Sequence, residues 1–176
     1  MHVNARKIAL SGVLAAFAVV LIVLGSIFET STLFLLAAAA FCVGIVVREW
    51  GIAYGAAFLT ACTLLGVIVS PQKMYCMTFA AMGIYLLLAE AGWEALAKAE
   101  RIPKIILWVW KYLVFNSMFL PALYFFPSLL VAKKMTKTLF FVMAAAGQAG
   151  IFIFDRAYIY FQAEVWGRLR GKVMKQ

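Results

Sequence analysis

The chain has 176 residues, of which 66% are hydrophobic and 13% are charged, whereas a soluble domain carries roughly 45–50% apolar and about 25% charged residues. Too few polar side chains remain to coat a soluble body, so the composition excludes a soluble globular domain and makes lipid the solvent for most of the chain. The formal charge of +9 would suggest a nucleic-acid partner in a soluble protein. In a membrane protein it indicates contact with anionic lipid, and we expect no nucleic-acid partner.

Six apolar segments have about the length that a bilayer-spanning helix needs. We interpret them as helices because an open sheet cannot satisfy its backbone hydrogen bonds in lipid. They cover residues 8–28, 32–47, 52–70, 74–92, 105–126 and 138–161, and polar or helix-stopping residues separate them. The sequence therefore predicts an all-α, polytopic integral membrane protein with six transmembrane helices in a single membrane domain, residues 1–176.

Lys and Arg residues gather on one side of the predicted spans. With the N-terminus inside, the outer loops hold four of them, Lys73, Lys133, Lys134 and Lys137. The cytoplasmic ends and loops hold eleven: Arg6, Lys7, Arg48, Lys98, Arg101, Lys104, Lys111, Arg168, Arg170, Lys172 and Lys175. Because cytoplasmic loops are enriched in Lys and Arg, we expect both termini to lie in the cytoplasm. The first apolar run is longer than the 7–15 residues of a signal-peptide core, so we expect it to be retained as a span.

Small residues line one face of the first helix. They are Ala5, Ala9, Gly12 and Ala16, and Ser11 and Ala15 widen the stripe. Small side chains let transmembrane helices approach closely enough to associate. The stripe is either a docking face for a partner membrane protein or a packing face inside this chain's own bundle, and the sequence favours neither. A similar face on the third helix, with Gly51, Gly55, Cys62 and Gly66, is interpreted as internal packing.

Ionisable side chains inside spans are costly and usually have partners. Glu90, Lys111 and Asp155 all fall on the cytoplasmic side of their helix centres. Opposite charges at one depth suggest a pair, so we predict an ion pair between Lys111 and Asp155, with Arg156 extending toward the interface. We interpret this pair as a structural clasp in preference to a proton relay.

A second group of polar residues falls nearer the midplane or the outer side. Its members are Glu29, Lys73, Tyr75, Thr78, Asn116, Tyr124 and Gln148. Convergence of a few polar groups on a mostly apolar pocket is typical of a small-molecule site, so these residues are the candidate substrate-binding residues. Ordinary hydrogen bonding between helices is the alternative explanation for each of them.

Catalytic and metal-binding signatures are missing from the sequence. His2 is the only histidine, and Cys42, Cys62 and Cys76 form no CxxC pair, so neither a histidine-based nucleophile relay nor a standard zinc site is available. No nucleophile elbow, phosphate-binding loop or dinucleotide motif occurs. We expect no enzymatic activity, no catalytic residue, no metal and no cofactor.

Several segments resemble a known transporter family. The opening ARKIALSGVLAAFAVV is similar to the start of the substrate-binding S components of energy-coupling factor (ECF) transporters, which have six short helices and both ends inside. Four further stretches are similar to uncharacterised bacterial membrane proteins grouped with them: VVREWG, SPQKMY, LVFN and FDRAYIY. The resemblance spans most of the chain and implies a multi-pass protein of the bacterial cytoplasmic (plasma) membrane.

The resemblance also implies a function and partners. S components capture vitamins or metal ions near the outer surface, and an Ala-x-x-x-Ala pattern on helix one packs against a transmembrane coupling subunit driven by two ATPases. Here the strict pattern occurs only as Ala5 and Ala9, and the deeper pairs are Ser11 with Ala15 and Gly12 with Ala16. One histidine is too little for metal uptake. We therefore expect a subunit that binds a small organic micronutrient such as a vitamin; the alternative is a non-transport membrane scaffold or assembly protein that binds other helices or lipid.

Overall fold

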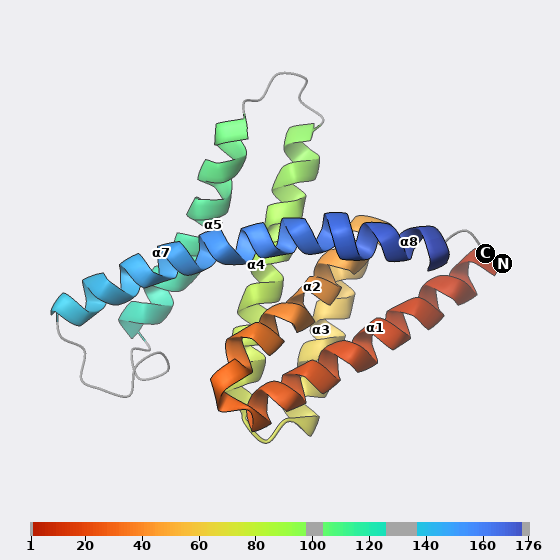
Figure 1. The fold of residues 1–176 in the computed structure, drawn as a ribbon, viewed down its shortest axis with the longest axis horizontal. Helices are drawn as coiled ribbons and strands as arrows, with labels where there is room; N and C mark the ends of the chain where they lie inside the picture. Colours follow the sequence, from red (N-terminus) through yellow and green to blue (C-terminus); the bar gives the residue numbers. More distant parts are fainter. Residues whose placement is uncertain (1, 98–103, 126–136, 174–176) are drawn as a thin grey trace. The chain divides into compact units, whose positions relative to one another are not determined.

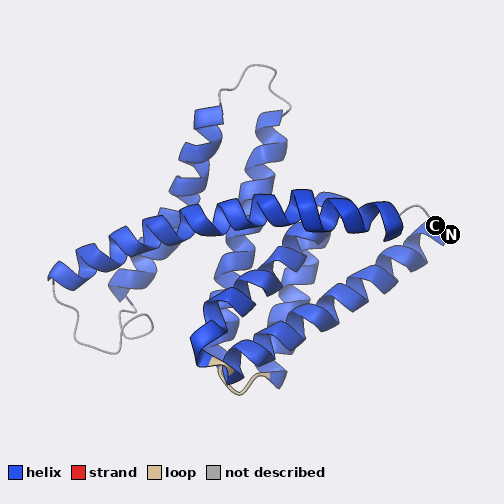
Figure 2. Ribbon diagram, in the orientation of Figure 1, coloured by secondary structure: helices blue, strands red, loops and turns tan. Residues whose placement is uncertain are grey.

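The computed structural model describes residues 2–97, 104–125 and 137–173, nearly all of them helical (Figures 1 and 2). The elements in chain order are α1 (His2–Ile27), a 3-10 turn (Glu29–Ser31), α2 (Thr32–Trp50), α3 (Ile52–Val69), α4 (Lys73–Ala97), α5 (Lys104–Phe125), α7 (Lys137–Tyr160), a π-helical segment (Phe161–Trp166) and α8 (Gly167–Val173). Six of these helices are long and apolar enough to cross a membrane. This confirms the predicted all-helical class and fits a multi-pass membrane protein.

The six predicted spans coincide with the six long helices, but several ends differ. The second and fourth helices continue beyond the predicted ends, to Trp50 and Ala97. The last predicted span ends at about residue 161. The helix does not end there, because the chain stays helical through the π segment and α8 to Val173. The i,i+4 ion pair between Glu164 and Arg168, with 2.6 Å between Oε2 and Nη2, stabilises this polar extension. Lys98, Arg101, Lys133, Lys134 and Lys175, counted for the orientation, lie outside the described residues.

Residues 1–107 form one compact unit that contains α1 to α4. In it α2 packs against α1, α3 and α4, which lie around it in Figure 1. An unbroken run from Ala39 to Val47 is buried, because α2 has neighbours on several sides. A helix that is apolar all round is expected at such a central position, and this helix forms the core of the unit.

Two short junctions determine how the helices of this unit follow one another. The Thr32 hydroxyl lies 2.8 Å from the carbonyl oxygen of Gly25 and 3.1 Å from that of Phe28, so it joins the start of α2 to the end of α1. Gly51 separates α2 from α3 with φ 90° and ψ 172°, a conformation that is essentially restricted to glycine. Its N–H donates to the carbonyl of Val47 and ends α2.

Residues 108–176 form the second unit, which contains α5 from Trp108 onward, α7, the π segment and α8. Side-chain contacts join α5 to α7 at three levels: Trp108 with Phe152, Lys111 with Asp155, and Asn116 with Gln148. Numbers rise along α5 as they fall along α7, so the two helices are antiparallel. The units are described each by itself, and the expectation of a single membrane domain stays a prediction.

Candidate functional site

The α1 small face, defined as Ala5, Ala9, Gly12 and Ala16, is exposed. A Cβ added at Gly12 would meet no heavy atom within 4 Å. The buried residues of this helix, among them Ala18, Ile22 and Gly25, lie on its other side and pack into the α1–α4 unit. Within the α1–α4 unit the small face therefore has no helix packed on it, which favours docking over packing inside that unit.

The two residues expected to widen this stripe lie toward the bundle. Ser11 and Ala15 are half-buried, and the Ser11 hydroxyl donates to the carbonyl oxygen of Lys7 at 2.6 Å. A hydroxyl bonded to its own helix offers less to a partner than a free one does. The accessible part of the predicted docking face is thus the four-residue α1 small face.

The small face of α3 has the opposite placement. Gly55, Cys62 and Gly66 are buried, and a Cβ added at Gly55 would collide with the side chain of Val47 on α2. At Gly66 the same addition would lie 3.3 Å from the sulfur of Cys76 on α4. The expectation that this face packs inside the bundle is confirmed for these three residues, whereas Gly51 precedes α3 and a Cβ added there would meet no heavy atom within 4 Å.

An ion pair joins α5 to α7. Nζ of Lys111 lies 2.6 Å from Oδ1 of Asp155, and the two side chains are 17% and 2% exposed. Oδ2 of Asp155 is buried and has no hydrogen-bond partner among the described residues. Lys111 also lies 5.7 Å from the ring centroid of Trp108. Since each helix supplies one charge, the pair fixes the register of α5 against α7.

Arg156 follows Asp155 and has a different environment. Its guanidinium carbon lies 5.5 Å from the centroid of Trp108 and 5.4 Å from that of Phe152. These two rings stack on each other at 5.7 Å. The sequence predicts that Arg156 extends toward the interface, and the structure adds that its guanidinium lies over an aromatic platform built by both helices.

A second interhelical ion pair was missed by the sequence analysis. Nη2 of Arg48 on α2 lies 2.7 Å from Oε1 of Glu90 on α4, and Nε of Arg48 donates to the same oxygen at 2.8 Å. Arg48 was counted only as a loop charge, but α2 continues past it to Trp50. The signal that could have found it is that both residues lie at the ends of apolar segments that the predicted topology puts on the same side.

The candidate substrate-binding residues divide between the two units. Lys73, Tyr75 and Thr78 belong to α4, where Lys73 is exposed and the Thr78 hydroxyl donates to the carbonyl oxygen of Met74. The other three with described side chains, Asn116, Tyr124 and Gln148, belong to α5 and α7. Glu29 begins the 3-10 turn after α1, and its side chain lies outside the description. Convergence of the whole set on one pocket stays a prediction.

Two of these residues do meet. Nε2 of Gln148 donates to Oδ1 of Asn116 at 2.6 Å, and Nδ2 of Asn116 donates to the carbonyl oxygen of Tyr112 at 2.8 Å. This arrangement is interhelical hydrogen bonding, the alternative that the sequence left open, and it uses both ends of the Asn116 amide and the Nε2 end of the Gln148 amide. Tyr124 is exposed near the end of α5.

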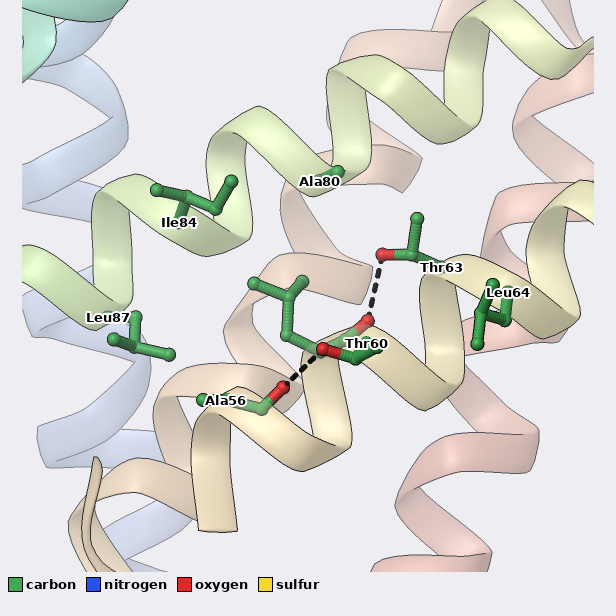
Figure 3. Close-up of a pocket in the computed structure, with 8 residues that line it drawn as sticks. Ala56, Thr60, Thr63, Leu64, Ala80, Ile84 and Leu87 are labelled. Carbon is green, nitrogen blue, oxygen red and sulfur yellow. Dashed lines mark hydrogen bonds between the residues drawn. The ribbon is translucent and has the colours of Figure 1, made fainter. Parts of the chain in front are cut away.

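The α1–α4 unit has a groove between α3 and α4, of about 390 Å³ (Figure 3). Alanine, leucine and isoleucine side chains make up most of its lining. Its two threonines, Thr60 and Thr63, donate to the carbonyl oxygens of Ala56 and Leu59, as the dashed lines in Figure 3 mark. Because both hydroxyl protons are used within α3, the groove offers a ligand mainly apolar contact.

The parts of the chain that the structure describes contain no group of three or more His, Cys, Asp or Glu side chains placed to hold a metal ion. The three cysteines are buried and unpaired with one another. No family model, curated protein or solved structure matches the chain.

Proposed function

We propose that this chain is the substrate-binding membrane subunit of an ATP-driven, ECF-type importer for a small organic micronutrient such as a vitamin. In this proposal it is a multi-pass protein of the bacterial cytoplasmic membrane with both termini inside. It binds the substrate and docks on a transmembrane coupling subunit that carries two ATPases. The chain itself has no nucleotide-binding motif, so the driving force must come from such a partner.

The observation that carries the proposal is the exposed α1 small face. Lipid-exposed helices gain little by associating through large apolar side chains, because lipid is equally apolar. Close backbone approach along small residues supplies the packing instead. The four residues are exposed while the comparable face of α3 is buried inside the unit, so the α1 small face is available to a helix from outside this unit. In the family that the chain resembles, the coupling subunit packs on this helix, which supports the proposal.

A non-transport scaffold or assembly protein is the second candidate. The groove of Figure 3 favours this candidate, because its threonine hydroxyls donate to their own helix and leave mainly apolar contact for a ligand. Small-molecule sites usually combine apolar walls with a few polar groups that orient the ligand. A scaffold needs only helix-docking faces and would use the same α1 small face, so the two functions differ in partner and ligand.

Co-purification tests the proposal. Tagged wild-type protein extracted in mild detergent is expected to bring down a coupling subunit and two ATPases. Gly12→Leu with Ala16→Leu is expected to release them, since the added side chains hold the partner helix away. The added atoms at Gly12 meet only open space in this chain, so the bundle stays intact. Phe17→Trp is the matched control, because Phe17 is exposed but lies about 100° around the helix from Ala16 and about 140° from Gly12.

The outcomes separate the candidates. ATPases that follow wild type and the Phe17 variant but not the double variant support the importer. Membrane proteins without ATPases, released by the same double variant, favour the scaffold. Partners that stay bound to the double variant contradict the docking role of the α1 small face. Mass spectrometry of small molecules extracted from the purified protein identifies the ligand that the importer requires.

A further inference from the structure

Arg156 lies over an aromatic platform that α5 and α7 build together. The guanidinium lies over Trp108 of α5 and Phe152 of α7, within 5.5 Å of both ring centroids. Cation–π contacts of this kind restrain the planar group while leaving its N–H donors free to bind an anion. Arginine binds phosphate bidentately through such a fork of donors.

The charge around the platform is unbalanced. Lys111 is paired with Asp155 at 2.6 Å, so these two charges cancel. Arg156 has no ion pair or hydrogen bond to any other described residue; its contacts there are the two rings. The cluster therefore carries one excess positive charge, and an anion is the ligand that would complete it.

The surroundings indicate what kind of anion this is. Both helices belong to the segments long and apolar enough to span a membrane. Phe152 of the platform is itself partly exposed, and Val109 and Ile153, which follow Trp108 and Phe152 in the sequence, are exposed apolar side chains on the same two helices. A free phosphate ion would gain nothing from these side chains, whereas acyl chains would pack on them. A positively charged position on spanning helices also attracts anionic lipid headgroups.

We propose that Arg156, held over Trp108 and Phe152, binds the phosphate of an anionic phospholipid whose acyl chains lie along α5 and α7. Lys111 lies near the same Trp108 ring and neutralises Asp155, so the positive charge of Arg156 keeps the local potential positive. The headgroup accepts hydrogen bonds from the guanidinium of Arg156. This site is distinct from the substrate-binding residues and from the α1 small face, and it does not depend on the proposed transport function.

Native mass spectrometry of the full chain in mild detergent tests the site. Phosphatidylglycerol and phosphatidylcholine are titrated separately against wild type, Arg156→Gln and Arg168→Gln. Arg168 is the matched control because it is an exposed arginine that pairs with Glu164 in the polar helical extension. We expect Arg156→Gln to weaken phosphatidylglycerol binding about ten- to a hundredfold, the effect of losing a charge-assisted pair of hydrogen bonds. Arg168→Gln is expected to change it less than about threefold.

Further arms keep the test decisive. Wild type is expected to prefer phosphatidylglycerol over phosphatidylcholine, and inorganic phosphate at millimolar concentration is expected not to displace the lipid. Unchanged binding by Arg156→Gln, or an equal loss in both variants, would overturn the site. Displacement of the lipid by inorganic phosphate would overturn the lipid assignment. Arg156→Lys keeps the charge without the planar fork, so it is expected to bind phosphatidylglycerol more tightly than Arg156→Gln but less tightly than wild type. Thermal unfolding of Arg156→Lys, compared with that of wild type, checks that the fold is retained.

Discussion

Replacing Lys111 by methionine should destabilise the α5–α7 unit strongly. Methionine keeps most of the side-chain volume but leaves the Asp155 carboxylate, only 2% exposed, without the one described group that hydrogen-bonds it. Breaking a buried ion pair by removing one partner costs about 3–5 kcal/mol, because the other charge stays buried and uncompensated. Lys111 itself is 17% exposed, so the converse variant Asp155→Leu should cost less, since the ammonium group can shift outward along Trp108.

The double variant separates the pair from its parts. Lys111→Met with Asp155→Leu removes both charges and should lie within about 1–2 kcal/mol of wild type, as apolar replacements of buried pairs often do. The free energy of unfolding is measured by titrating the purified protein from mild detergent into sodium dodecyl sulfate and following tryptophan fluorescence. A double variant as unstable as Lys111→Met alone would refute the reasoning, because the cost would then come from packing and not from an isolated carboxylate.

Two further predictions concern packing and topology. Gly55→Val should destabilise the α1–α4 unit by about 1–3 kcal/mol, because its Cβ meets Val47. Gly12→Val should change the free energy of unfolding by less than about 0.5 kcal/mol. Equal losses of unfolding free energy for the two variants, in the same detergent titration, would contradict the assigned faces. All native cysteines are buried, so introduced cysteines report the topology. An impermeant thiol reagent should label Gln72→Cys in intact cells and Arg170→Cys only after lysis. Labelling of Arg170→Cys in intact cells and of Gln72→Cys only after lysis would overturn the proposed orientation.

The helices could be predicted because lipid leaves a chain few alternatives. An apolar run of this length must bond its backbone internally, so composition alone locates the spans. Their polar ends could not be predicted equally well. The last helix continues past residue 161 through a π segment and α8, where hydropathy no longer distinguishes helix from loop and local pairs such as Glu164 with Arg168 decide.

The contacts between helices were predictable only in part. Lys111 and Asp155 could be paired because their charges are opposite and their depths similar. The same reasoning passed over Arg48 and Glu90, because Arg48 was assigned to a loop and α2 in fact continues to Trp50. The place of Arg156 over Trp108 depends on how α5 and α7 are rotated about their axes. The position of a residue along its span does not determine this rotation.

The exposure of the α1 small face required the structure. Ala5, Ala9, Gly12 and Ala16 have the same spacing whether the face packs inside or outside the chain. The deciding observation is that the residues on the other side of α1, such as Ala18 and Ile22, are buried. A helix has one side toward its bundle, and here that side holds Ala18 and Ile22, whereas the α1 small face lies on the other side.

The most direct test of the central claim is photo-crosslinking from the α1 small face in living cells. A photoreactive amino acid is placed at Gly12, where an added Cβ meets open space, and in a separate variant at Phe17, which is 55% exposed on another face. We predict that the Gly12 position crosslinks to a transmembrane coupling subunit and that the Phe17 position gives far less of this adduct. Crosslinks from Gly12 to lipid alone, or the same protein adduct in equal yield from both positions, would contradict docking through this face.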